Sequence, residues 1–74
     1  MLIQFYKYTI INNTVYWLNT KAERSFAARI MSINNRSRSD VFLTRTPNST
    51  LRKANPKKDS YIGTIDKYGN ISTR

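Results

Sequence analysis

Few side chains in this sequence are suited to catalysis, and those few stand far apart along the chain. There is no cysteine and no histidine, which removes cysteine nucleophiles, imidazole acid–base groups and zinc sites built on sulfur or imidazole. The four acidic residues are spread along the chain rather than paired, and paired carboxylates need two acids that converge on one bond. The only glycines, Gly63 and Gly69, form no phosphate-binding loop. We therefore expect no enzymatic activity, no metal site and no cofactor.

One enzymatic alternative stays open, which is RNA cleavage without histidine. Small ribonucleases of the toxin type use arginine, lysine and tyrosine to stabilise phosphate charge and to move protons. The same residue types occur here at Arg45, Arg52, Lys53 and Tyr61. No motif accompanies them, and positive charge near a phosphate explains binding without any chemistry. Binding is therefore the favoured interpretation.

An excess of positive charge is the strongest functional signal in the sequence. Thirteen lysines and arginines stand against four acidic residues, giving a formal net charge of +9. Self-repulsion on this scale destabilises a compact chain, so the excess favours an anionic partner. A basic stripe neutralises phosphates and releases counterions, which gives affinity without sequence selectivity. The residues predicted to bind nucleic acid or an acidic partner are Arg36, Arg38, Arg45, Arg52, Lys53, Lys57 and Lys58.

Aromatic residues form a second candidate binding feature, in the first predicted hairpin. Tyr6, Tyr8 and Tyr16 carry hydroxyl groups that can stay hydrated on an open sheet face, where aromatic rings stack on unpaired bases. A patch of these three tyrosines would also suit a protein partner or self-association. Ordinary cross-strand packing is the alternative role for them, and it is the favoured role for Phe5 and Trp17.

A single small domain spanning residues 1–74 must position these side chains, because a chain of this length has room for only one core. Residues 2–11 are rich in β-forming side chains and predict a strand. Both of its faces are half apolar, which favours a central strand or a covered edge. Asn12 and Asn13 tolerate positive φ and predict a tight turn to a second strand at 14–18.

A helix over about residues 21–33 is the clearest local prediction. Thr20 and Glu23 have the spacing of a capping box at its start, and an Asn-Asn pair follows its end. The large apolar residues of the helix recur at helical spacing, which predicts that they form the face packed on the sheet. That predicted core stripe consists of Ala22, Phe26, Ile30 and Ile33, with Ala27 beside them.

The remaining elements complete an α+β fold. Residues 40–46 predict a third strand, and residues 47–60 a long basic loop with two prolines. Residues 61–66 and 70–73 predict a closing hairpin, with Gly69 as a left-handed turn residue. The predicted order is ββαβ–loop–ββ, with one helix packed on a twisted antiparallel sheet.

These observations favour a small, basic, non-enzymatic protein that associates with nucleic acid through its phosphate backbone. The alternative is an inhibitor of the phage type that binds a host protein or nucleoprotein complex, in host defence or transcription, and blocks its nucleic-acid-handling surface. A component of a larger ribonucleoprotein is a third option. The composition is typical of AT-rich coding, and a cytoplasmic location without a membrane partner is expected, in the host if the protein is phage-encoded. A homodimer is also compatible, with an open first strand pairing with its copy.

Overall fold

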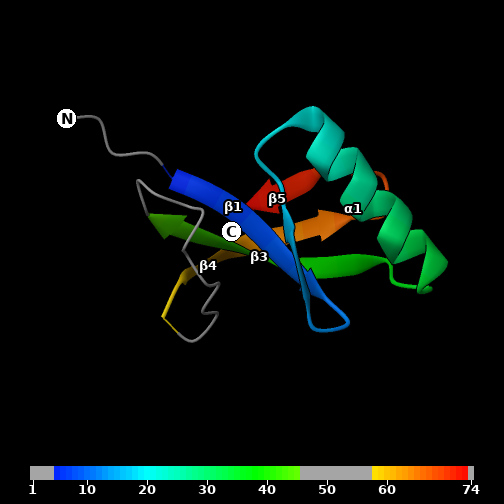
Figure 1. The fold of residues 1–74 in the computed structure, drawn as a ribbon, viewed down its shortest axis with the longest axis horizontal. Coiled ribbons are helices and arrows are strands. Elements are labelled where there is room, and N and C mark those ends of the chain that lie inside the picture. Colours follow the sequence, from blue (N-terminus) through cyan, green and yellow to red (C-terminus); the bar gives the residue numbers. More distant parts are fainter. Residues whose placement is uncertain (1–4, 46–57, 74) are drawn as a thin grey trace.

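The structure is a computed structural model that describes residues 5–45 and 58–73. Its strands form one antiparallel sheet in the order β2-β1-β3-β4-β5, and the single helix lies against one face of it (Figure 1). The α+β class and the predicted order of elements are confirmed, although most of the predicted loop at 47–60 lies outside the described residues. The elements are β1 (Phe5–Ile11), β2 (Thr14–Trp17), α1 (Lys21–Ile33), β3 (Arg38–Arg45), β4 (Ser60–Asp66) and β5 (Ile71–Thr73).

The turn between β1 and β2 follows from its two asparagines. Asn12 has φ 50° and Asn13 has φ 64°, and a two-residue turn of type I′ requires positive φ at both central positions. β1 then lies between β2 and β3, so its prediction as a central strand is right. The idea that an open first strand pairs with its copy is wrong, because the edge strands of the sheet are β2 and β5.

Both ends of α1 are closed by the residues that the sequence singles out. The backbone N–H of Glu23 donates to Thr20 Oγ1 at 3.1 Å, and the N–H of Thr20 donates to Glu23 Oε1 at 2.8 Å. These reciprocal bonds confirm the capping box. At the other end Asn35 has φ 56°, and the N–H of Arg36 donates to Met31 O at 2.8 Å. This left-handed residue and the bond that spans it form a Schellman motif, which directs the chain into β3.

The face by which α1 packs on the sheet differs from the predicted one. Ala27, Ala28 and Met31 are buried, whereas Phe26 is 56% exposed and Ile33 is 75% exposed. Three members of the predicted core stripe, Ala22, Phe26 and Ile33, are therefore wrong. Ile30 is partly buried against the core, and Ala27 beside the stripe is buried as predicted. The buried side chains are mostly small, and they allow the helix backbone to lie close to the rest of the fold. The core that they meet contains Ile11, Leu18, Val41 and Ile65.

The opposite face of the sheet carries a row of aromatic rings. Tyr8 stands opposite Trp17 on β2 and opposite Phe42 on β3, with ring centroids 5.5 Å and 5.6 Å away. Phe42 continues the row to Tyr61 on β4 at 6.0 Å. Cross-strand aromatic pairs of this kind stabilise a sheet beyond the area that they bury.

Candidate anion-binding surface

Two segments that carry exposed basic residues meet at the end of the domain where α1 gives way to β3. Arg36 is the last residue of the Schellman motif, and Arg38 begins β3. The backbone N–H of Lys67, in the β4–β5 turn, donates to Ser37 O at 3.2 Å. This bond ties the turn to the segment that carries both arginines. We call Arg36, Arg38 and Lys67 the basic end of the domain, and all three side chains are exposed.

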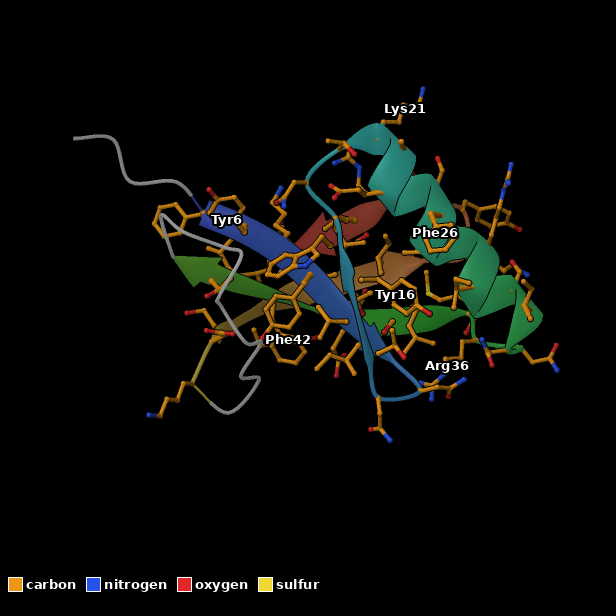
Figure 2. All side chains as sticks on the ribbon, viewed as in Figure 1. Tyr6, Tyr16, Lys21, Phe26, Arg36 and Phe42 are labelled. Atoms are coloured by element: carbon orange, nitrogen blue, oxygen red, sulfur yellow. The ribbon has the colours of Figure 1, made fainter. Side chains whose placement is uncertain are left out.

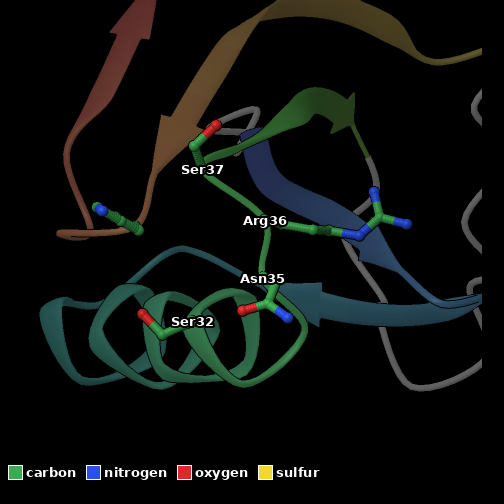
Figure 3. A pocket seen from close by; sticks show the side chains of 5 residues that line it. Ser32, Asn35, Arg36 and Ser37 are labelled. Atoms are coloured by element: carbon green, nitrogen blue, oxygen red, sulfur yellow. The ribbon is translucent and has the colours of Figure 1, made fainter.

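A shallow polar pocket of about 290 Å³ lies at the basic end. Hydroxyl, amide and ammonium groups surround it, and each can donate a hydrogen bond to an anion. Figure 3 shows the Arg36 guanidinium extending away from Ser32 and Ser37, so the charged group lies apart from the hydroxyl groups of the pocket, and the side chain is exposed. The residues that line the pocket are Ser32, Asn35, Arg36, Ser37 and Lys67.

Three carboxylates in the described residues accept hydrogen bonds from neutral donors. Glu23 belongs to the capping box, and Asp59 accepts the Tyr8 hydroxyl at 2.5 Å. Asp66 stands opposite Arg38 in the β3–β4 register. Its Oδ1 nevertheless accepts two backbone amides of the β4–β5 turn, at 2.9 and 3.0 Å. Within the described ranges, no member of the basic end forms an ion pair with an acidic residue, so its charge is available to a ligand.

An aromatic ring accompanies this charge. Tyr68 is 76% exposed, and the Lys67 ammonium lies 5.5 Å from the centre of its ring. A cation over a ring is a stabilising arrangement, worth about 0.5–1 kcal/mol at exposed sites. The β4–β5 turn therefore presents a cation and a stacking surface side by side. Sequence reasoning passed over Lys67 and Tyr68 as binding residues, although the turn signal at Gly69 already indicated that this segment would be exposed.

The structure does not gather the predicted basic residues on one surface. Arg45 ends β3, seven residues beyond Arg38, which separates their backbones by about 23 Å in an extended strand. The side chain of Arg45 is not described. Lys58 is exposed and precedes β4, toward the same end as Arg45. Arg52, Lys53 and Lys57 lie outside the described residues. The described structure therefore divides the other predicted residues between two ends of the sheet, with Arg36 and Arg38 at one and Arg45 and Lys58 at the other.

The three predicted stacking tyrosines do not form one patch. Tyr6 and Tyr8 point to the face of the sheet opposite α1, where Tyr8 is fully buried. Tyr16 points to the helix face and lies 5.9 Å from Phe26, measured between ring centres. Figure 2 shows this separation, with Tyr6 far from Tyr16. In this arrangement Tyr8 acts in packing, and a base cannot stack on it.

Other kinds of site find no support in the described residues. No cluster of three or more histidine, cysteine, aspartate or glutamate side chains occurs in the ranges 5–45 and 58–73, and no helix in these ranges is long and apolar enough to cross a membrane. No protein-family model, curated protein or solved structure matches the chain. The case for a function therefore depends on the chemistry of the surface itself.

Proposed function

We propose that this protein is a non-enzymatic nucleic-acid-binding domain that contacts the phosphate backbone through its basic end. The observation that carries the proposal is that Arg36, Arg38 and Lys67, all exposed, lie on two segments joined by the backbone bond from Lys67 to Ser37. The net charge of +9 supplies long-range attraction for a polyanion. The basic end supplies the direct contacts with phosphate groups.

The chemistry of the three side chains suits phosphate. Each arginine presents a planar fork of donors that can bind two phosphate oxygens at once. Lys67 adds a compact charge, and the neighbouring Tyr68 ring offers a stacking surface. Stacking of an unpaired base on such a ring is worth roughly 1–3 kcal/mol and requires no particular base. We therefore expect weak sequence preference, and tighter binding to strands that contain unpaired bases.

Fluorescence anisotropy with labelled oligonucleotides tests this proposal. Binding measured over a salt series is expected to weaken as salt rises, with a slope near −0.9 per phosphate contact on duplex DNA and near −0.7 on single strands. The variant R36A/R38A/K67A is expected to flatten that slope by about 2 to 3, because three contacts are lost. Tyr68→Ala is expected to weaken single-strand binding by about tenfold and duplex binding far less.

A charge-matched control separates a local site from general attraction. The variant K21A/R29A/K58A also removes three exposed cations, and it leaves the basic end intact. Equal losses of oligonucleotide affinity in the two triple variants would contradict the proposed site and indicate non-specific attraction. A protein that ignores oligonucleotides at low salt, but captures one protein from a nuclease-treated lysate, would instead support the inhibitor alternative.

A further inference from the structure

The open edge of the sheet at β2 has a defined hydrogen-bonding pattern. The N–H of Leu18 donates to Lys7 O at 2.8 Å, so these two residues form a bonded pair across the β1–β2 ladder. In an antiparallel ladder, bonded and non-bonded pairs alternate. Tyr16 therefore bonds to β1, whereas Val15 and Trp17 direct their N–H and C=O groups away from it. Within the described residues, no backbone bond of a turn or loop uses those outward groups.

A groove of about 360 Å³ runs beside this edge, between β2 and the first turns of α1. It opens on the half-exposed ring of Phe26, which lies next to Tyr16 (Figure 2). The exposed apolar stripe of the helix continues from Phe26 to Ile33. The groove is therefore part of a larger apolar surface. Its lining residues are Val15, Tyr16, Trp17, Ala22, Glu23 and Phe26.

We propose that a second copy of this chain covers this surface, by antiparallel pairing of β2 with β2 across a two-fold axis through Tyr16. The outward backbone groups belong to Val15 and Trp17, which are placed symmetrically about Tyr16. One register alone uses all of them: Val15 of each copy pairs with Trp17 of the other, and Tyr16 faces its own copy. An edge whose open groups are centred on one residue is self-complementary, as a two-fold interface requires.

The charge of the groove agrees with this occupant. Among the residues that the structure describes, no cation lines it, and its single charged residue, Glu23, is held in the capping box. A second copy brings the neutral Tyr16 and the apolar Phe26 to the junction, and its own Glu23 is likewise held in the capping box. The cations of the basic end lie elsewhere, and salt screens charges that are more than about 8 Å apart at physiological ionic strength. The net charge of +9 therefore weakens the pairing at low salt without preventing it.

Sedimentation equilibrium over a range of protein and salt concentrations measures the association. A monomer–dimer equilibrium is expected, and its dissociation constant should fall as salt rises, because the main opposing force is charge repulsion. Val15→Pro removes an outward N–H that β1 does not use, and edge strands tolerate proline. It should raise the dissociation constant by about thirtyfold, since two backbone hydrogen bonds are lost per dimer. Val15→Ala keeps the N–H and should change the dissociation constant by less than about threefold.

Cysteine crosslinking tests the register without depending on the proline variant. Tyr16→Cys places two thiols on the axis as a directly opposed pair, with Cβ atoms roughly 4.5–5.5 Å apart. It should form an interchain disulfide under mild oxidation, and reduction should reverse it. Thr14→Cys is the control, because its copy lies two residues off the axis on each strand, about 13 Å away. A monomer at every concentration, or equal crosslinking of the two variants, would overturn the proposal.

Discussion

The orientation of α1 can be tested by truncating one buried and one exposed side chain of the same helix. Met31 has no exposed surface and belongs to the core, whereas Phe26 is 56% exposed. Truncation of a fully buried methionine to alanine typically costs about 2–5 kcal/mol, since burial is lost and a cavity remains. A domain of 74 residues has a free energy of unfolding of only about 4–11 kcal/mol. Met31→Ala should therefore remove a large part of the total stability.

Truncation of Phe26 should lower the free energy of unfolding much less. Complete burial of a large apolar side chain contributes about 1.5–3 kcal/mol, and less than half of the Phe26 surface is covered. The expected cost of Phe26→Ala is therefore about 1 kcal/mol. Met31→Ala should therefore lower the free energy of unfolding by at least about 1 kcal/mol more than Phe26→Ala does, although phenylalanine is the larger residue.

Urea unfolding, followed by far-UV circular dichroism and by Trp17 fluorescence, measures both values. The protein should be dilute enough to be monomeric, because Phe26 also borders the proposed dimer contact. Similar slopes of free energy against urea would show that the variants unfold from comparably compact states. A Phe26→Ala cost equal to or above that of Met31→Ala would refute the orientation of the helix. It would restore the interpretation that Phe26, Ile30 and Ile33 form the core face.

Two further substitutions test local features of the fold. Gly63→Ala should destabilise the domain strongly and detach β5, because a Cβ there would come 2.0 Å from the backbone oxygen of Ser72. Hydrogen exchange should show that the β5 amides lose their protection in Gly63→Ala. Protection equal to that of the wild type would contradict the close contact between β4 and β5. Thr20→Ala removes the acceptor for the Glu23 amide and should cost about 1 kcal/mol. Thr20→Ser keeps the capping hydroxyl and serves as the control. Equal melting temperatures of Thr20→Ala and Thr20→Ser would argue against the capping box.

The features predicted correctly are those whose chemistry is local. Thr20 and Glu23 stand three residues apart, and they close the helix by bonds to each other's backbone. Asn12 and Asn13 accept the positive φ that the turn needs wherever the strands lie. Such signals require no knowledge of the rest of the fold. For this reason the element order could be derived from the sequence with bounds close to the observed ones.

The helix face could not be derived in the same way. One apolar stripe on α1 contains Phe26 and Ile33, and another contains Ala27 and Met31. Periodicity does not say which of the two stripes meets the sheet. The choice depends on how closely another element approaches. The β4–β5 turn passes so near that a Cβ at Gly69 would lie 3.5 Å from the Arg24 carbonyl oxygen and 3.9 Å from the Ala28 Cβ. A contact between residues about forty positions apart leaves no trace in local spacing.

The candidate site was predicted in part for a related reason. Charge density indicated Arg36 and Arg38, because they stand in the basic half of the chain. Lys67 and Tyr68 belong to a less basic segment. They reach the arginines only because β3 pairs with β4, so that Arg38 comes opposite Asp66. Composition can therefore indicate a partner class, while the identity of the contacting residues depends on strand pairing.

Rising salt should have opposite effects on binding at the two proposed surfaces, and this difference separates them experimentally. Phosphate contacts weaken as counterions accumulate, whereas pairing of two molecules of net charge +9 strengthens as their repulsion is screened. A dimer would carry two basic ends, so one long strand could engage both and gain affinity from effective concentration. Binding to a long oligonucleotide should then depend on protein concentration and fall in Val15→Pro, while binding to an oligonucleotide that spans one basic end should not change. Loss of short-strand binding in that variant would show that the edge of β2 contacts the nucleic acid itself.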